Sequence, residues 1–274
     1  MRLLIVGGSG FLGTELVRRA SAAGWTTAAT YRSAIPGTAP PGVSWHRLDL
    51  RAPARLDGLL GELAPDAIIN ASSGLSDWEV TADGSVRVAM AAAHRGHRLV
   101  HVSSDAVFSG SRISYDESCL PDPVTPYGAA KAAAETAVRL LTPGSAIART
   151  SLIIGDGGSA HERMVRELAA GTREGVLFTD VVRCPVHVGD LAAALLGLAD
   201  SDRSGMFHLA GPDALSRHEL GVLIARRDGL DASRLPAGRR GAASMPLDVR
   251  LDGRATRDLL GVRLRGAREF LRLP

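Results

Sequence analysis

The start of the chain places an apolar run directly before a glycine-rich turn. Leu3 to Val6 is typical of a buried strand, residues 7–13 read Gly-Gly-Ser-Gly-Phe-Leu-Gly, and residues 14–20 are typical of a helix. A strand that runs through such a turn into a helix is the opening unit of a parallel sheet covered by helices. This order of segments therefore predicts an α/β fold.

The rest of the first half repeats the pattern. Short apolar runs alternate with longer amphipathic stretches up to about residue 150, and most of the runs end near Gly, Ser, Asp or Pro. The predicted strands are Leu3 to Val6, Thr26 to Tyr31, Val43 to Arg47, Ala67 to Asn70, Arg98 to Ser103 and Ser145 to Arg149. We expect a doubly wound parallel sheet of the Rossmann type, in which ligands bind beyond the carboxyl ends of the strands.

The second half is less regular and has helical patterns around residues 160–170, 189–200, 216–228 and 252–260. We expect residues 1–155 to form a dinucleotide-binding domain, completed by part of 180–205. Residues 156–274 are expected to form mainly a smaller, interleaved substrate-binding lobe. Within this half, His208 reads as a strand or core histidine, and Asp190 as a helix N-cap.

The glycine turn predicts a dinucleotide site. A glycine at position 7 permits a tight turn, one at 10 lets the backbone approach a pyrophosphate, and one at 13 lets helix and strand pack closely. The helix N-terminus then faces the anion. The expected contacts are Gly7, Gly10, Phe11, Leu12 and Gly13; the alternative is a merely structural turn.

The end of the second strand distinguishes the two nicotinamide cofactors. A carboxylate there binds the ribose 2′-hydroxyl of NAD, whereas an arginine accommodates the 2′-phosphate of NADP. The strand ends at Tyr31-Arg32, and no Asp or Glu occurs between Glu15 and Asp49. The sequence thus favours NADP(H) bound by Arg32, although Arg32 can also be read as an ordinary surface arginine.

Two further strand ends are expected to contact the cofactor. Asp49 and Leu50 follow the third strand near the adenine edge, and Asn70, Ala71 and Ser72 end the fourth strand beneath the nicotinamide half. Asp49 is equally suited to hold backbone amides of its own turn, since Asp is a favoured turn residue.

A tyrosine and a lysine begin a predicted helix four residues apart. Tyr127 and Lys131 therefore share one face of that helix. A phenol has a pKa of about 10 in water, and a nearby ammonium favours the phenolate, so we expect Lys131 to lower the pKa of Tyr127. Ser104, at the end of the fifth strand, can add a second hydroxyl that orients a carbonyl oxygen. We predict Ser104, Tyr127 and Lys131 to be catalytic, with Tyr127 and Lys131 also contacting the cofactor.

Together these motifs resemble the extended short-chain dehydrogenase/reductase superfamily, and within it the dTDP-4-dehydrorhamnose reductase group. The similarity to that group lies in residues 103–110, 115–117 and 126–131, and later in 149–151, 185–192, 205–211 and 246–252. The resemblance implies an NADPH-dependent reductase acting on the 4-keto group of a nucleotide-linked deoxysugar. It also implies a possible homodimer.

Departures from the group bear on the substrate. Residues 151–160 lack the aromatic residue and the Asn-Phe pair that help to hold the nucleotide sugar, and the loop of residues 74–78 is atypical. Three alternatives stay open: a reductase of another small carbonyl compound, a nucleotide-sugar epimerase, and a non-catalytic NADP-binding regulatory subunit like that of methionine adenosyltransferase.

The composition limits which partners, which location and which cysteine chemistry we expect for the protein. The net charge is +3 with Lys and Arg scattered along the chain, which favours a small-molecule substrate over nucleic acid. The apolar run before Gly7 is too short for a signal peptide or a membrane span, so we expect a cytoplasmic protein with no membrane partner. The two cysteines, Cys119 and Cys184, are far apart and predict neither a disulfide nor a metal site.

Overall fold

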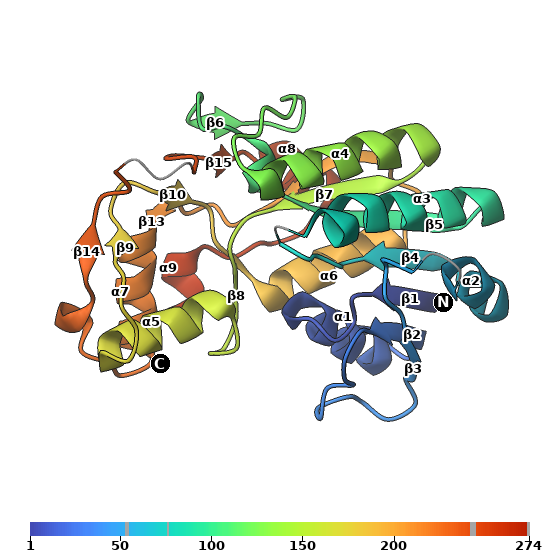
Figure 1. The fold of residues 1–274 in the computed structure, drawn as a ribbon, viewed down its shortest axis with the longest axis horizontal. Coiled ribbons are helices and arrows are strands. Elements are labelled where there is room, and N and C mark those ends of the chain that lie inside the picture. Colours follow the sequence, from blue (N-terminus) through green and yellow to red (C-terminus); the bar gives the residue numbers. More distant parts are fainter. Residues whose placement is uncertain (53–54, 76, 242–244, 273–274) are drawn as a thin grey trace. The chain divides into compact units, whose positions relative to one another are not determined.

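A computed structural model describes residues 1–52, 55–75, 77–241 and 245–272 of the chain (Figure 1). Ser76, in the atypical loop, lies outside the described residues. The chain forms two compact units. The first comprises residues 1–107, 125–149 and 192–207, and the second comprises residues 108–124, 150–191 and 208–274. Residues 108–124, expected in the first domain, thus belong to the second unit.

A seven-stranded sheet in the order β12-β7-β5-β4-β1-β2-β3 is the centre of the first unit. Its strands are β1 (Arg2–Val6), β2 (Thr26–Tyr31), β3 (Ser44–Arg47), β4 (Ala67–Asn70), β5 (Arg98–Ser104), β7 (Ala146–Thr150) and β12 (Gly205–Leu209). The pairs β1–β2, β1–β4, β2–β3 and β4–β5 are parallel. The six predicted strands are confirmed, and their ends differ from the predicted ones by at most one residue.

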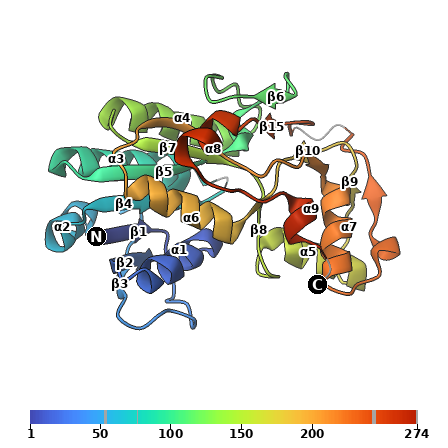
Figure 2. The ribbon, with the colours of Figure 1, turned by 180° about the vertical axis from the view of Figure 1, so that it is seen from behind.

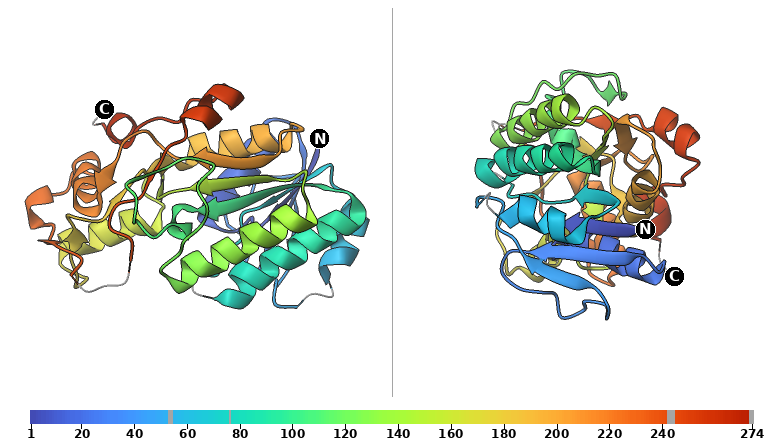
Figure 3. Two further views of the ribbon diagram at one scale, coloured as in Figure 1. Left: turned by 90° about the horizontal axis from the view of Figure 1, so that it is seen from above. Right: turned by 90° about the vertical axis from the view of Figure 1, so that its right-hand side faces the viewer.

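Helices cover this sheet on both sides. They are α1 (Phe11–Ala22), α2 (Leu56–Leu63), α3 (Gly84–Arg95), α4 (Pro126–Leu141) and α6 (Val188–Ala199), with short turns η2 (Glu79–Asp83) and η3 (Asp105–Val107). Helices α3 and α4 pack side by side on one face, and α6 lies on the other (Figures 2 and 3). Strand residues such as Leu4 and Ile68 fill the core between the layers. The expected doubly wound α/β fold is confirmed.

The second unit contains short strands and four helices in its described part. The strands are β6 (Ser114–Tyr115), β8 (Ile153–Ile154), β9 (Leu177–Phe178), β10 (Val182–Arg183), β11 (Val186–His187), β13 (Leu215–Ser216), β14 (Ala237–Gly238) and β15 (Arg250–Leu251). The helices are α5 (Ala160–Ala170), α7 (Arg217–Arg227), α8 (Arg254–Leu260) and α9 (Ala267–Phe270), with the turn η4 (Ala232–Arg234). Helices α5 and α7 pack together around Val165, Leu177 and Leu220. The helical segments predicted in this half are confirmed as α5 to α8.

Two side chains of the second half test the sequence reading directly. His208 is fully buried in β12, so its interpretation as a core histidine is confirmed. Asp190 is not an N-cap, because it is the third residue of α6. Its carboxylate instead accepts hydrogen bonds from the backbone and guanidinium of Arg265. Separately, no helix in the described ranges is both long enough and apolar enough to span a membrane.

Candidate active site

The glycine turn forms an uncapped helix N-terminus above the edge of the sheet. Gly7 has a φ of +84°, and a Cβ there would lie 2.9 Å from Ser72 Cα, so the turn excludes larger residues. At Gly13 a Cβ would lie 2.1 Å from the Gly7 carbonyl oxygen, because helix α1 passes close to β1. Gly10 is exposed, and a Cβ on it would meet only the Gly7 carbonyl, at 3.4 Å. The open backbone at Gly10 and the uncapped N-terminus of α1 suit an anionic group.

Phe11 and Leu12 begin α1. Leu12 is buried and Phe11 is half-buried, so at this site their backbone N–H groups, rather than the side chain of Leu12, are placed to meet a ligand. The turn is tied to the second strand, since Thr30 Oγ accepts a hydrogen bond of 3.0 Å from Gly7 N.

Arg32 is exposed just beyond the end of β2. Its guanidinium is near enough to Asp77 to contribute to the lowered pKa of that carboxyl, although the main cause is a hydrogen bond from Arg51. Arg51 also forms an ion pair with Asp49, at 3.4 Å. An exposed arginine at this strand end can receive a phosphate.

The residues that follow β3 and β4 serve the scaffold as well. Asp49 Oδ1 accepts from Arg51 N at 3.1 Å, which is the turn role that was considered for it, and the Leu50 side chain lies in the core. Asn70 is fully buried, and its Oδ1 accepts from both the N–H and the hydroxyl of Ser72. Ala71 is half-buried between them. Any contact of these residues with a cofactor stays a prediction.

Tyr127 and Lys131 lie on one face of α4, as their spacing predicts. The helix is started by Thr125, whose side chain accepts from Gly128 N at 3.0 Å, and by Pro126 at its first position. Ser104, half-buried at the end of β5, lies close enough to the Tyr127 hydroxyl to lower the pKa of that phenol. The structure therefore brings together two of the predicted catalytic side chains.

The pKa of Tyr127 is raised, which is the opposite of the expected direction. Burial is the largest cause, the side chains of Ser104 and Ser73 lower the pKa, and the Asp105 carboxylate raises it. Lys131 Nζ donates to the carbonyl oxygen of Val102 at 3.0 Å. Desolvation of the phenolate outweighs the stabilisation that the sequence suggested, so Tyr127 stays a protonated phenol at neutral pH.

Lys131 is itself strongly perturbed. Burial lowers its pKa to about 8, and the negative charge of Glu135 opposes this effect. Glu135, one further turn along α4, pairs with Arg149 through bonds of 2.9 and 2.8 Å and accepts from Ser103 Oγ at 2.6 Å. His101 is also fully buried, and burial together with the charge of Lys131 lowers its pKa to about 3, so His101 is neutral. A buried polar network of Ser103, Glu135 and Arg149 thus lies one turn along α4 from Lys131.

Sequence reasoning missed Ser73 and Glu135. Glu135 continues the Tyr127, Lys131 spacing by one more interval of four, and that repeat was visible in the sequence. Ser73, in the loop after β4, lowers the pKa of Tyr127, but a serine in a loop carries no signal in the sequence alone.

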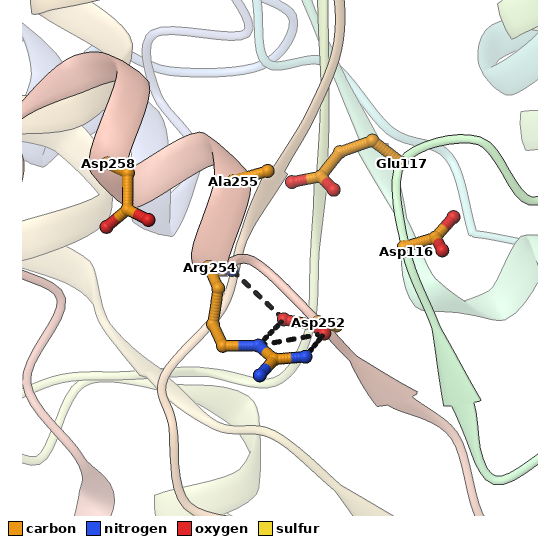
Figure 4. Close-up of a pocket in the computed structure, with 6 residues that line it drawn as sticks. All are labelled: Asp116, Glu117, Asp252, Arg254, Ala255 and Asp258. Atoms are coloured by element: carbon orange, nitrogen blue, oxygen red, sulfur yellow. Dashed lines mark hydrogen bonds and ion pairs between the residues drawn. The ribbon is translucent and has the colours of Figure 1, made fainter.

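The second unit has a pocket of its own, lined mainly by charged residues: Asp116, Glu117, Asp252, Arg254, Ala255 and Asp258 (Figure 4). Arg254 and Asp252 form an ion pair of 2.7 Å. Glu117 accepts from Thr256 N at 3.2 Å. In the ranges that the structure describes, no group of three or more His, Cys, Asp or Glu side chains is arranged to hold a metal ion.

Comparisons with known proteins cover the whole site. Residues 1–272 match the family described as the RmlD substrate binding domain. The probable low-salt glycan biosynthesis reductase of Haloferax volcanii is 31% identical over 252 residues, which cover 85% of this chain and 82% of that protein. The dTDP-4-dehydrorhamnose reductase of Mycobacterium tuberculosis is 30% identical over 251 residues, with coverage of 85% and 78%.

A solved structure shares the fold. The dTDP-4-dehydrorhamnose reductase of Bacillus anthracis, crystallised in complex with NADP, superposes with a TM-score of 0.82 over 98% of this chain and 96% of that one, at 23% identity.

Proposed function

This chain belongs to the family of the RmlD substrate binding domain, and on that premise we propose that it is an NADPH-dependent reductase of a ketone. The observation that carries the proposal is the place of Ser104 at the carboxyl end of β5, close enough to Tyr127 to lower its pKa, with Lys131 on the same face of α4 as Tyr127. In parallel α/β sheets this edge is where ligands bind. Two hydroxyls at this edge are suited to bind one carbonyl oxygen.

The residues present fit an NADP cofactor. The open backbone at Gly10 and the N-terminus of α1 are suited to the pyrophosphate, and the exposed Arg32 is suited to the 2′-phosphate. The Bacillus anthracis relative was crystallised with NADP. When bound, NADPH supplies the hydride for the carbonyl carbon.

The chain's own residues manage the oxygen and the proton. Ser104 donates a hydrogen bond that polarises the carbonyl and fixes its orientation. Tyr127 gives its phenolic proton to the oxygen as negative charge develops there, and the raised pKa keeps it in the protonated form that this step needs. Lys131, on the next turn of α4, is held by the hydrogen bond that its Nζ donates to the carbonyl oxygen of Val102. Solvent then returns the proton to Tyr127.

For the substrate we propose the 4-keto group of a nucleotide-linked deoxysugar. The support is the pair of relatives at 30 and 31% identity, one a dTDP-4-dehydrorhamnose reductase and the other a probable glycan biosynthesis reductase. A cytoplasmic location and a homodimer remain predictions from the sequence.

The test follows NADPH oxidation with dTDP-4-dehydrorhamnose in the wild type and in Tyr127→Phe. The phenylalanine variant keeps the ring but removes the proton, so we expect unchanged NADPH affinity and a turnover reduced by roughly 10²–10⁴-fold, the range for loss of a general acid. Unchanged turnover in that variant would refute the assignment. Tightly bound cofactor that is never consumed favours an epimerase, and a wild type inactive on every ketone tried favours the regulatory alternative.

A further inference from the structure

Two segments flank the glycine turn and Arg32 at the carboxyl edge of the sheet. In the strand order β4-β1-β2-β3, the turn follows β1 and Arg32 follows β2, so both lie between the ends of β4 and β3. The β4 segment (residues 71–75, 77 and 78) meets the turn, because a Cβ on Gly7 would lie 2.9 Å from Ser72 Cα. The β3 segment (residues 48–52) is tied to β2, since Leu48 N donates to the carbonyl oxygen of Tyr31 at 2.9 Å.

One arginine joins these two flanking segments. Arg51, in the β3 segment, donates a hydrogen bond from its guanidinium to the carboxylate of Asp77, in the β4 segment. Strands β3 and β4 are three strand spacings apart in the sheet, which is roughly 14 Å. The ion pair therefore connects two segments that the sheet itself holds apart.

The guanidinium of Arg51 is surrounded by carboxylates. Besides Asp77, it pairs with Asp49 at 3.4 Å and with Glu79 at 3.7 Å. The hydrogen bond from Arg51 is the largest cause that lowers the pKa of Asp77, so Asp77 is charged at neutral pH. Asp77 is also fixed from its own side, because its Oδ1 accepts from Val80 N at 3.2 Å. The charge of Arg51 is thus balanced within the protein.

Arg51 and Arg32 are therefore suited to different tasks. Arg32 forms no ion pair with any other residue that the structure describes, so its charge is available for a phosphate. Arg51 could reach a phosphate only by leaving its carboxylates, and those carboxylates would repel the phosphate. We expect Arg51 to act on NADPH and NADH alike, since it does not depend on the 2′-phosphate.

We propose that Arg51 and Asp77 are a positioning pair for the adenosine half of the cofactor. Their ion pair fixes the β3 segment against the β4 segment before the cofactor arrives, and these segments carry the predicted contacts Asp49, Leu50, Ala71 and Ser72. A site whose segments are ordered in advance loses less conformational entropy when it binds its ligand. This inference rests on the proposed function for the presence of the dinucleotide, and not for the reaction.

The experiment measures the dissociation constants of NADPH and NADH by fluorescence titration of the whole chain. Arg51→Ala removes the guanidinium, and Asp77→Asn removes the charge while keeping an oxygen that can accept from Val80 N. We expect each variant to weaken both cofactors by about 3- to 5-fold, the range for a partly exposed ion pair. The ratio of the two dissociation constants should stay within about twofold of the wild type, whereas Arg32→Ala should change it.

A double variant tests whether the two residues act through each other. If the ion pair is the device, Arg51→Ala combined with Asp77→Asn should bind no more weakly than Arg51→Ala alone, because the contact is already lost. Independent contributions would instead multiply to a loss of about 9- to 25-fold, and that result would overturn the pair.

The ion pair of Arg95 and Asp57 provides a matched control. It joins α3 to α2 at 2.7 Å, its side chains are 31% and 50% exposed, and Arg95 is the last residue of α3, at the end away from η2. Arg95→Ala should lower the thermal stability about as much as Arg51→Ala does, but leave both dissociation constants unchanged. Equal losses of affinity in Arg95→Ala and Arg51→Ala would mean general destabilisation and overturn the proposal.

Failure here is separable from failure of the proposed function. If Arg51→Ala binds both cofactors as the wild type does, the pair has no part in binding, and the reductase stands on Tyr127→Phe. If Arg51→Ala weakens NADPH alone, Arg51 is a phosphate ligand and the positioning role is wrong. If the pair behaves as expected but Tyr127→Phe retains full turnover, the cofactor site stands and the reaction has been assigned wrongly. A wild type that binds neither NADPH nor NADH overturns both proposals.

Discussion

The buried pair of Glu135 and Arg149 offers the sharpest test of how α4 is held. Their side chains are 4% and 2% exposed, and they are joined by two hydrogen bonds, of 2.9 and 2.8 Å, while Ser103 donates to the same carboxylate. The change to make is Glu135→Gln, which keeps the shape of the side chain and removes its charge. It also turns one acceptor into an amide that faces the guanidinium.

The expected loss of stability is about 3–5 kcal/mol, the cost of removing one member of a buried ion pair. The large value arises because Arg149 keeps a buried charge whose carboxylate is gone. A typical domain has a free energy of unfolding of about 5–15 kcal/mol, so this loss is a substantial part of the total. Lys131 should respond as well, since Glu135 is the charge that opposes the lowering of its pKa by burial. Its pKa should fall further below about 8.

Urea unfolding followed by circular dichroism measures the effect. Glu62→Gln is the matched control, because Glu62 is exposed on α2 of the same unit, and its change should stay within about 0.5 kcal/mol. A double variant, Glu135→Leu with Arg149→Met, should regain most of the lost stability, since neither member of the pair then leaves a buried charge without the other. A loss below about 1 kcal/mol in Glu135→Gln would refute the reasoning, because it would mean that the pair is hydrated or replaceable.

Three further predictions follow from single contacts. Gly13→Ala should destabilise the first unit by about 1–3 kcal/mol or more, because its Cβ would lie 2.1 Å from a backbone oxygen. Gly197→Ala is the control: it has open space around it and should stabilise α6 by about 0.5–1 kcal/mol. Thermal unfolding measures both changes. Arg32→Ala should weaken NADPH binding by about 10- to 100-fold and leave NADH binding unchanged in fluorescence titrations, and equal losses for both cofactors would contradict the phosphate role. His101 has a folded pKa of about 3, below its ordinary 6.5, so the unfolded state takes up the proton first and stability is lost as the pH falls between these values. The free energy of unfolding measured from pH 6 to 4 should therefore fall less steeply in His101→Gln, by up to about 1.4 kcal/mol per pH unit.

The sequence by itself determined the architecture and half of the chemistry. Short apolar runs, amphipathic stretches and a glycine turn are local patterns, so they predicted the ends of the strands to within one residue and the face shared by Tyr127 and Lys131. The first helix was predicted too short, since α1 runs from Phe11 to Ala22 and the pattern gave residues 14–20. The prediction that Ser104 lies at the end of β5 also came from a local apolar run. Because parallel strands bring their carboxyl ends to one edge of the sheet, this position predicts a place at the edge where ligands bind.

Only the tertiary structure decided what surrounds these groups. The register of β4 against β5 places Asn70 opposite His101. The packing of α4 buries the phenol, and its pKa rises where the sequence suggested a fall. The pairing of Glu135 with Arg149 links a helix to a strand. Such properties depend on which distant residues exclude water from a side chain or approach its charge, and no local pattern records that. The sequence therefore indicated which groups are candidates for the reaction, and the fold set the proton affinity of these groups.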